Sequence, residues 1–345
     1  MKSRGFQKWL ILAVAVVTAI SVSGRGGFAQ TNSAASPANP YRLVDGWAHL
    51  PEGRIWGSIS AIAVDSKGHI WAAERCGKND CSDSDLDPIM EFDANGKIIK
   101  SFGKGLYVWP HAINFDHEGN FWFTDYGCKN GKGNVAVKYS PEGKILMTLG
   151  KAGVEGDGPD LFSDVDAVVE APDGDLFVAD GHTIGKGNAR IMKFTKDGKF
   201  IKQWGEHGSG PGQFEIPHDI AIDSKGRLFV ADRGNKRIQI FNQDGKFLEE
   251  WKQFGDPSGI YIDKNDVIYV SDSWSQSNDP KVVERYNPGF DHGIRVGSAK
   301  TGKVTAYLPL PQPPKNAPEG IAADKAGNLF VADTIDPGVK KYIKQ

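Results

Sequence analysis

Residues 218–232 read HDIAIDSKGRLFVAD, which is two apolar runs around an Asp-x-x-Gly turn, closed by an aspartate. Alternating apolar residues on both sides of such a turn are typical of a β-hairpin. Five further stretches follow the same pattern: SAIAVDSKGHIWAAE from Ser60, HAINFDHEGNFWFTD from His111, DAVVEAPDGDLFVAD from Asp166, SGIYIDKNDVIYVSD from Ser258 and EGIAADKAGNLFVAD from Glu319. The closing acidic residues are Glu74, Asp125, Asp180, Asp232, Asp272 and Asp333. Their spacing of 51, 55, 52, 40 and 61 residues is typical of propeller blades.

A second hairpin follows the first in each unit, as in residues 188–205 and 235–251, where apolar residues alternate around an Asp-Gly turn. Six units of four short strands, without helical periodicity, predict an all-β, six-bladed β-propeller. The last unit ends at Ile343 without a fourth strand, whereas a strand-like stretch, Tyr41–Trp47, precedes the first unit. We expect this N-terminal strand to complete the last blade and close the ring, so that residues 41–345 form one domain.

One stretch departs from the repeat. Residues 278–316 separate the fifth unit from the sixth and contain NPGFDHGIRVGSAKTGKVTAYLPLPQPP. We interpret them as an insertion that forms a lid or a partner-binding loop.

The N-terminus has the composition of an export signal. A basic start is followed by the apolar run Trp9–Val22 and by Gly27-Phe28-Ala29, which predicts cleavage before Gln30. Residues 1–29 are therefore expected to be a signal peptide and residues 30–40 a flexible leader. An uncleaved membrane anchor is the alternative, although the apolar run is short for a membrane span.

Composition narrows the class of partner. The formal net charge of −2 offers no basic surface for nucleic acid or for an anionic membrane. We expect a periplasmic or secreted monomer that takes a small-molecule or peptide substrate and does not insert into a membrane after signal cleavage. In an oxidising compartment, one disulfide among Cys76, Cys81 and Cys128 is expected. Cys76 with Cys81 is the local choice, and Cys128 competes as a partner.

Hairpin geometry gathers polar residues at one end of the predicted channel. His218 and Arg233 are equally far from the turn at Lys225-Gly226, so antiparallel pairing brings them side by side. The same arithmetic pairs Ser60 with Arg75, His111 with Tyr126, Asp166 with Gly181 (which His182 follows), Ser258 with Ser273, and Glu319 with Thr334. Because the first strand of each blade lines the channel, these side chains are expected to ring one channel mouth.

The residue types at this mouth suggest a metal-dependent site. Two imidazoles and a carboxylate, from His111, His218 and Glu319, are suitable ligands for Zn²⁺ with one position left open. Arg75 and Arg233 are suited to binding a substrate carboxylate, and the candidate catalytic acids or bases are Tyr126 and His182. The alternatives are that the histidines bind backbone groups or water, that Arg233 forms an ion pair as Arg237 does, and that Asp180, Asp232 and Asp333 bind backbone groups.

The repeats resemble the NHL family over nearly all of the mature chain. At the channel residues the sequence is similar to the peptidyl-α-hydroxyglycine α-amidating lyases, in LDPIMEFDANGKIIKSFGKGLYVWPHAINFDHEGNFWFTD, LFVADGH and WGEHGSGPGQFEIPHDIAIDSKGRLFVADRGNKRIQIF. This resemblance implies a six-bladed propeller with zinc on three channel histidines. It also implies two arginines and a tyrosine that act on hydroxyglycine, release of a peptide amide and glyoxylate, and a structural Ca²⁺ in the channel.

By this resemblance His111 and His218 match two zinc histidines, and Arg75 and Arg233 match the two arginines. The chain differs at two positions. The third zinc histidine falls at Glu319, in Ala-Pro-Glu-Gly, and the catalytic tyrosine falls at His182, in Asp-Gly-His.

Three functions are consistent with these residues. The first is a metal-dependent lyase acting on a small carboxylate-bearing, peptidyl-hydroxyglycine-like substrate in the channel. The second is a non-catalytic NHL propeller that binds a protein or ligand in the cell envelope. The third is a lactonase or hydrolase-type propeller with calcium, whose sites favour Glu, Asn and Asp over paired histidines.

Overall fold

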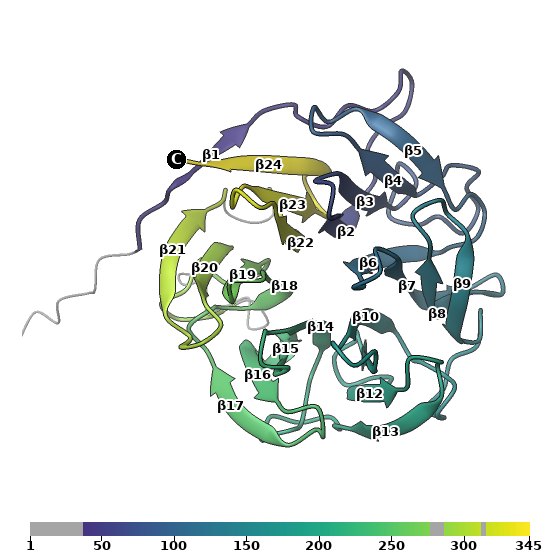
Figure 1. The fold of residues 1–345 in the computed structure, drawn as a ribbon, viewed down its shortest axis with the longest axis vertical. Helices are drawn as coiled ribbons and strands as arrows, with labels where there is room; N and C mark the ends of the chain where they lie inside the picture. Colours follow the sequence, from purple (N-terminus) through teal and green to yellow (C-terminus); the bar gives the residue numbers. More distant parts are fainter. Residues whose placement is uncertain (1–36, 277–285, 312–314) are drawn as a thin grey trace, which may run out of the picture. The chain divides into compact units, whose positions relative to one another are not determined.

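The computed structural model describes residues 37–276, 286–311 and 315–345. Six four-stranded antiparallel sheets surround a central channel in this part of the chain (Figure 1). The innermost strands are β2 (Ile59–Val64), β6 (Trp109–Phe115), β10 (Val165–Glu170), β14 (Pro217–Ile222), β18 (Pro257–Ile262) and β22 (Pro318–Ala323). The second strands are β3 (Ile70–Glu74), β7 (Phe121–Lys129), β11 (Leu176–Asp180), β15 (Leu228–Asp232), β19 (Val267–Asp272) and β23 (Leu329–Asp333). The six-bladed propeller expected from the repeats is confirmed.

The third and fourth strands of each blade lie progressively further from the channel. The third strands are β4 (Ile89–Phe92), β8 (Lys132–Tyr139), β12 (Arg190–Phe194), β16 (Arg237–Phe241), β20 (Gly293–Ser298) and β24 (Gly338–Lys344). The fourth strands are β5 (Ile98–Phe102), β9 (Ile145–Gly150), β13 (Phe200–Trp204), β17 (Phe247–Trp251), β21 (Val304–Pro309) and β1 (Tyr41–Val44). A single turn of 3₁₀-helix, η1 (Arg233–Asn235), follows β15.

The ring is closed by the N-terminal strand. β1 pairs with β24 in antiparallel register, with Tyr41 opposite Lys344 and Val44 opposite Lys341. The residues just before β1 are also bound, since the N–H of Tyr307 donates to Ala38 O and that of Gln345 donates to Pro40 O. The predicted signal peptide lies outside the described residues, as does most of the predicted leader. No helix among the described residues has the length and apolar character to cross a membrane.

The interpretation of residues 278–316 as an insertion needs correction. Residues 277–285 and 312–314 lie outside the described part of the chain, but the stretch between them forms β20 and β21, the outer half of blade five. The strands were overlooked because their hairpin turns at Lys300–Gly302 without the Asp-Gly signal of the other blades.

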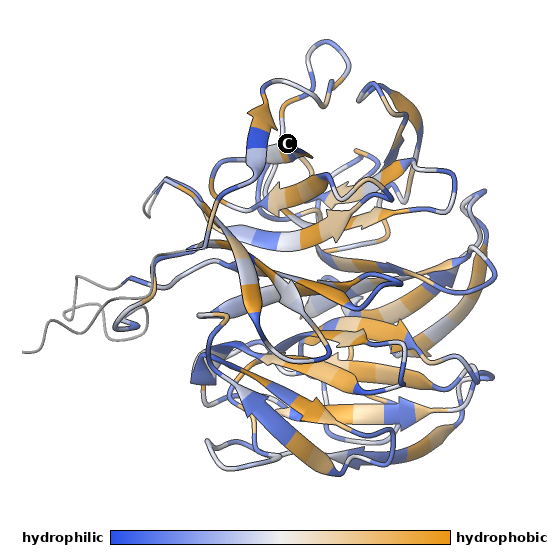
Figure 2. Cartoon of the chain, turned by 60° about the vertical axis from the view of Figure 1, so that its left-hand side comes forward, coloured by the Kyte–Doolittle hydropathy of each residue, from blue (hydrophilic) through white to orange (hydrophobic). Residues whose placement is uncertain are grey.

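The apolar core is divided among the contacts between blades. Each pair of neighbouring blades buries its own cluster in the described residues; Trp71, Phe121 and Phe123 fill the one between blades one and two. Where blade six meets blade one, Trp47 packs against Phe330 and Phe92. Hydrophobic residues accordingly follow the stacked strands and hydrophilic ones the loops (Figure 2). Because each cluster joins two blades, the ring is stabilised as a unit.

A β-bulge interrupts the first hairpin of every blade at its channel end. In blade four Pro217 pairs with Asp232 and Asp219 with Ala231, so His218 is the extra residue. The other blades have the same irregularity at Ser60, His111–Ala112, Asp166, Ser258 and Glu319–Gly320. A bulge re-aims the side chain of the extra residue, and here it repeats at the positions that line the channel.

The bulge also corrects the predicted pairing of His218 with Arg233. The N–H of Arg233 bonds to Ile216 O, two residues earlier than predicted. One residue of the difference comes from the turn, because Ile222 pairs with Leu228, and the other comes from the bulge. The side chains of His218 and Arg233 nevertheless lie at the same channel mouth.

Neighbouring inner strands approach too closely for a side chain at Gly320, where a Cβ would lie 2.0 Å from Ser60 O. We expect Gly320→Ala to lower the free energy of unfolding by about 2 kcal/mol, because backbone atoms of blades one and six would have to move apart. Gly158→Ala is the matched control, since its Cβ would meet nothing closer than 3.5 Å. Urea unfolding of both variants checks this, and equal stability of the two would contradict the close approach.

Candidate functional site

The closing carboxylates hold the chain that enters each blade. Asp125 is fully buried and accepts the N–H groups of Val108 and Trp109, immediately before His111. Asp232 is equally buried and accepts the N–H of Glu215, three residues before His218. The backbone-binding role considered for Asp180, Asp232 and Asp333 is confirmed, since Asp180 accepts from Ser163 and Asp333 from Ala317. These hydrogen bonds fix the position of the chain just before each inner strand.

Three imidazoles form a nearly equilateral triangle at the channel mouth. The ring centroids of His111 and His218 are 4.7 Å apart, those of His182 and His218 4.8 Å, and those of His111 and His182 5.1 Å. His111 and His218 are bulge residues of inner strands, whereas His182 follows β11. Gly181 before it has a φ of 142°, and a Cβ there would lie 2.0 Å from Asn188 O, so a glycine is needed to turn the chain.

The hydrogen bonds of two of these rings fix their tautomers. His111 Nδ1 donates to Asp166 O at 2.8 Å, and His218 Nδ1 donates to Ser258 O at 2.7 Å. Since a carbonyl can only accept, each Nδ1 carries the proton and each neutral Nε2 presents a lone pair. The two Nε2 atoms lie 3.2 Å apart.

Burial and the nearby guanidinium groups keep all three imidazoles neutral. Burial, followed by the charge of Arg75, lowers the pKa of His111 to about 3. Burial and the charge of Arg233 hold the pKa values of His182 and His218 well below their ordinary value. Neutral imidazoles are the form that binds a metal ion.

Asp166 joins this cluster from the bulge of blade three. It is fully buried, its Oδ1 accepts His182 Nδ1–H at 2.6 Å, and it lies 3.5 Å from His111 Nε2. Its Oδ2 has no hydrogen-bond partner, and burial raises the pKa of the carboxyl well above its ordinary value. Ligand atoms of Asp166 and the three histidines all lie within 4.8 Å of one another. The sequence placed Asp166 at the channel mouth, at the repeat position of His111 and His218, but assigned it no role in the site.

Glu319 lies beside the imidazoles but is paired with the two arginines. Its Oε1 is 3.4 Å from Arg233 Nη1 and 3.9 Å from His218 Nε2, and its Oε2 is 3.9 Å from Arg75 Nη2. Arg75 is held in place, because its Nη1 donates to Asn79 Oδ1 at 2.7 Å and its Nε to Pro110 O at 3.2 Å. Glu319 Oε2 has no hydrogen-bond partner.

Tyr126 completes the wall of the site. Its ring stacks on that of His182, with centroids 4.3 Å apart and planes 18° apart, and the guanidinium of Arg75 lies 5.5 Å from its centre. Burial raises the pKa of its phenol, so the hydroxyl is protonated at neutral pH. All the site residues expected from the sequence therefore meet at one channel mouth.

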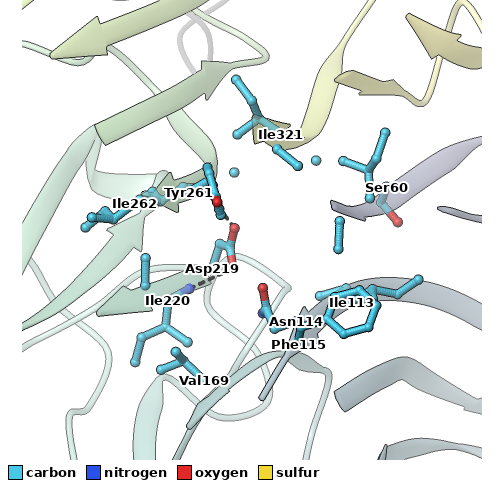
Figure 3. Close-up of a pocket in the computed structure, with 18 of the residues that line it drawn as sticks. Ser60, Ile113, Asn114, Phe115, Val169, Asp219, Ile220, Tyr261, Ile262 and Ile321 are labelled. Carbon is cyan, nitrogen blue, oxygen red and sulfur yellow. Dashed lines mark hydrogen bonds between the residues drawn. The ribbon is translucent and has the colours of Figure 1, made fainter. Parts of the chain in front are cut away.

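Two cavities approach this cluster from opposite sides. The larger, of about 640 Å³, is lined by the arginines, Tyr126, His182 and Glu319, and its size suits a small-molecule or peptide ligand. The smaller, of about 290 Å³, is lined by His111, His218 and Glu319 together with both apolar and polar side chains of the inner strands. Figure 3 shows Ile113, Ile220 and Ile321 among the apolar ones and Asn114 and Asp219 among the polar ones. Glu319 lines both, so it stands where the two cavities meet. Asp219 in the smaller one accepts the N–H groups of Ile220 and Ile260.

The disulfide joins Cys76 to Cys81 in the loop that carries Arg75, which confirms the local choice. Cys128 is a free thiol that accepts a hydrogen bond from Asn134 at 3.0 Å. The bridge therefore restrains the same loop that supplies Arg75 and its partner Asn79.

The chain is similar to known proteins of two kinds. Residues 161–282 match a family described as 6-bladed beta-propeller. Peptidyl-glycine alpha-amidating monooxygenase A of Xenopus laevis is 33% identical over 220 residues, which are 55% of this chain and 23% of that protein. The probable peptidyl-alpha-hydroxyglycine alpha-amidating lyase of Caenorhabditis elegans is 32% identical over 194 residues, 51% of this chain and 53% of that protein. The chain thus matches only part of each relative.

NHL repeat-containing protein 3 of Homo sapiens is 34% identical over 199 residues, 56% of this chain and 54% of that protein. Among solved structures, a gluconolactonase from Xanthomonas campestris covers 89% of this chain and 96% of its own with a TM-score of 0.58. At 12% identity this likeness shows the fold alone. The chain is a six-bladed β-propeller that is similar to NHL repeat-containing protein 3 and to the amidating lyases.

A buried carboxyl that the sequence did not single out also lines the larger cavity. Asp256 precedes β18, is 3% exposed, and its Oδ1 has no hydrogen-bond partner. Burial, followed by the charge of Asp272, raises the pKa of Asp256 to about 8. The residue before Pro257 carries no repeat signal, which is why pattern alone does not identify it.

This shift predicts a pH-dependent stability. Because the pKa of Asp256 is higher in the folded than in the unfolded chain, the folded state holds the extra proton, and stability is lost as the pH rises from about 4 through about 8. Relative to the wild type, Asp256→Asn should gain about 1.4 kcal/mol of stability per pH unit between pH 5 and pH 8 in thermal unfolding, because only the wild type loses proton-linked stability there. Asp85→Asn, at a carboxyl that is 91% exposed, is the control and should behave alike at both pH values. A constant difference between Asp256→Asn and wild type would contradict the shift.

Proposed function

We propose that this propeller, which resembles the amidating lyases, is a metal-dependent lyase that acts on a small carboxylate-bearing, peptidyl-hydroxyglycine-like substrate in the larger cavity. The observation that carries the proposal is the meeting of three neutral imidazoles with two guanidinium groups at one channel mouth, between two cavities that share Glu319. Burying such groups costs free energy unless they are paired or bind a ligand.

The donor set fits zinc. The Nε2 lone pairs of His111 and His218 face each other at 3.2 Å with no hydrogen between them, and a cation between them would turn this repulsion into two bonds. Nitrogen ligands suit Zn²⁺, whereas Ca²⁺ prefers six to eight oxygens. For Ca²⁺ the smaller cavity offers the carboxylate of Asp219, both of whose oxygens already accept N–H groups. Zinc is therefore the expected ion at the imidazoles, and calcium stays a second expectation for the channel.

The side chains of the larger cavity have different roles in the proposed reaction. A bound zinc ion polarises the substrate hydroxyl. Arg75 and Arg233 bind the substrate carboxylate, since their contacts with Glu319 are longer than the 2.7–2.9 Å of a tight charge-assisted bond. As the carbon–nitrogen bond breaks, the hydroxyl proton passes to a base and the oxygen becomes the carbonyl of glyoxylate. The leaving amide nitrogen takes up a proton. Tyr126 and His182 line the cavity as the candidate acid and base.

Export from the cytoplasm accords with this function. The Cys76–Cys81 disulfide is of the kind that persists in an oxidising compartment. We therefore propose a periplasmic or secreted enzyme whose substrate reaches it outside the cytoplasm.

Metal content tests the proposal directly. The purified protein should hold about one equivalent of zinc by elemental analysis, and the double variant His111→Ala/His218→Ala should hold none, because two of the nitrogen ligands are gone. His207→Ala, a half-exposed ring remote from the cluster, is the control and should keep the metal. If the wild-type protein, purified without metal chelators, contains no metal, the proposal is contradicted.

Arg233 tests the lyase activity itself. With a peptidyl-α-hydroxyglycine the wild type should release glyoxylate and the peptide amide in equal amounts. Arg233→Ala should lower kcat/KM about 100-fold or more, since a guanidinium that contacts the substrate carboxylate is lost. Lys236→Ala is the control, because Lys236 lines the same cavity without contacting Glu319 in the described hydrogen bonds and ion pairs. No turnover by a zinc-loaded wild type would favour the second function below.

The second function is a non-catalytic propeller that binds a ligand in the envelope. It is favoured by Glu319, which already offers a carboxylate to Arg75 and Arg233, the groups assigned to the substrate. It is also consistent with the match to NHL repeat-containing protein 3. A stable partner captured equally by the wild type and the double histidine variant, together with no glyoxylate release, would support it.

A further inference from the structure

His182 and Glu319 are the two candidates for the third metal ligand beside His111 and His218. We propose that the metal ion is held by His111, His182 and His218, and that Glu319 is not a ligand but the counter-charge of Arg75 and Arg233. This inference rests on the proposed function, because it presupposes that an ion is bound. It replaces the ligand set that the sequence predicts, in which Glu319 is the third ligand.

The first argument is the spacing of the imidazoles. Zinc binds nitrogen at about 2.0–2.1 Å in a tetrahedral arrangement, so two ligand nitrogens lie about 3.3 Å apart. His111 Nε2 and His218 Nε2 are 3.2 Å apart. With the ring centres about 1.2 Å beyond the nitrogens, the same geometry puts ring centroids about 5 Å apart. The three observed separations, 4.7, 4.8 and 5.1 Å, agree with this value.

The second argument is the hydrogen bond of His182. Its Nδ1 is 2.6 Å from Asp166 Oδ1, and its Nε2 faces the guanidinium of Arg233, which can only donate, so Nδ1 carries the hydrogen and Nε2 carries the lone pair. A carboxylate that accepts from the second nitrogen of a ligating histidine fixes the tautomer and the ring orientation. The remaining contact of Nε2 is with Arg233 Nη2 at 3.4 Å, at the long end of hydrogen-bond distances. Asp166 thus prepares His182 as a nitrogen ligand in the way that Asp166 O and Ser258 O prepare the other two histidines.

The third argument is the charge of the arginines. The side chains of Arg75 and Arg233 are only 5% and 12% exposed, and Glu319 is the carboxylate that contacts both among the described ion pairs. If Glu319 turned to bind the ion, two nearly buried guanidinium groups would be left close to a dication without a counter-charge. Removing one partner of a buried ion pair is strongly unfavourable. The electrostatics therefore keep Glu319 with the arginines.

This assignment also limits the acid–base roles. A histidine that binds the ion through Nε2 and donates its Nδ1–H to Asp166 has no nitrogen left to accept a proton from the substrate. Of the two candidates that line the cavity, Tyr126 is then the one whose polar group stays free to transfer a proton. Glu319 Oε2, which has no hydrogen-bond partner, is a second proton acceptor beside the ion.

The experiment measures zinc affinity by competition with a chromophoric chelator, using the mature full-length protein. His182→Ala should weaken zinc binding about 100-fold or more, because it removes a ligand as well as the ring that Asp166 orients. Glu319→Gln should change the affinity by no more than about 3-fold. Cobalt-substituted protein provides a second readout, since the visible absorption of Co²⁺ should change in His182→Ala and persist in Glu319→Gln. His207→Ala, an imidazole that lies beside the carboxylate of Glu215 and outside the groups of potential metal ligands among the described residues, is the matched control.

The outcomes separate the two proposals. If the wild type binds no ion, the proposed function fails. If the wild type binds one ion, but Glu319→Gln weakens the affinity and His182→Ala does not, this inference is overturned while the proposed function stands. Zinc X-ray absorption of the wild type decides the matter without any variant, in case His182→Ala does not fold. Three imidazole ligands would agree with the assignment, and two imidazoles with a protein carboxylate would overturn it.

Discussion

The channel site depends on hydrogen bonds made outside it, by the carboxylates that close the second strands. In each blade a buried carboxylate at the end of the second strand accepts an N–H of the chain that leads into the first strand, as Asp232 does from Glu215. In blades three, four and five the same carboxylate pairs with an arginine on the third strand, as Asp232 does with Arg237. Because an unpaired buried carboxylate is costly, the start of the inner strand has little freedom. The bulge that follows then directs one side chain per blade toward the axis.

The electrostatics of the channel mouth follow from the convergence of the bulge residues of the inner strands. Residues at equivalent positions of different blades are brought together at the axis, so their charges act on one another at short range. Burial, followed by the charge of the two guanidinium groups, lowers the pKa values of the imidazoles, so the rings are neutral. Glu319 reduces the positive charge that these groups would otherwise concentrate. A cluster of this kind has cation-binding atoms on one side and anion-binding atoms on the other, as a lyase for a hydroxy acid derivative requires.

Most of the fold could be read from the repeat, because period-two patterns and Asp-Gly turns are local signals. β20 and β21 were missed, since their turn at Lys300–Gly302 lacks that signal. At the site, the sequence identified which residues reach the mouth but not their contacts. The bulge at His218 shifts the register without leaving a pattern in the sequence. The proximity of His182 to the other two rings depends on the turn at Gly181. The hairpin spacing places Asp166 opposite Gly181, beside His182, but it does not predict the hydrogen bond between Asp166 and His182.

Glu319 is the residue that distinguishes the lyase hypothesis from the hypothesis of a non-catalytic, ligand-binding propeller. A substrate carboxylate can bind Arg75 and Arg233 only by sharing them with Glu319 or by displacing it. The long contacts of Glu319, between 3.4 and 3.9 Å, leave guanidinium N–H groups free for a second anion, which favours sharing. Glu319 lines both cavities, and its Oε2 has no hydrogen-bond partner, so this oxygen is available as a proton acceptor between the larger cavity and the imidazoles. In the proposed arrangement, a glutamate at this position is therefore compatible with the reaction, because Glu319 would serve as a base while His182 would supply the third nitrogen ligand.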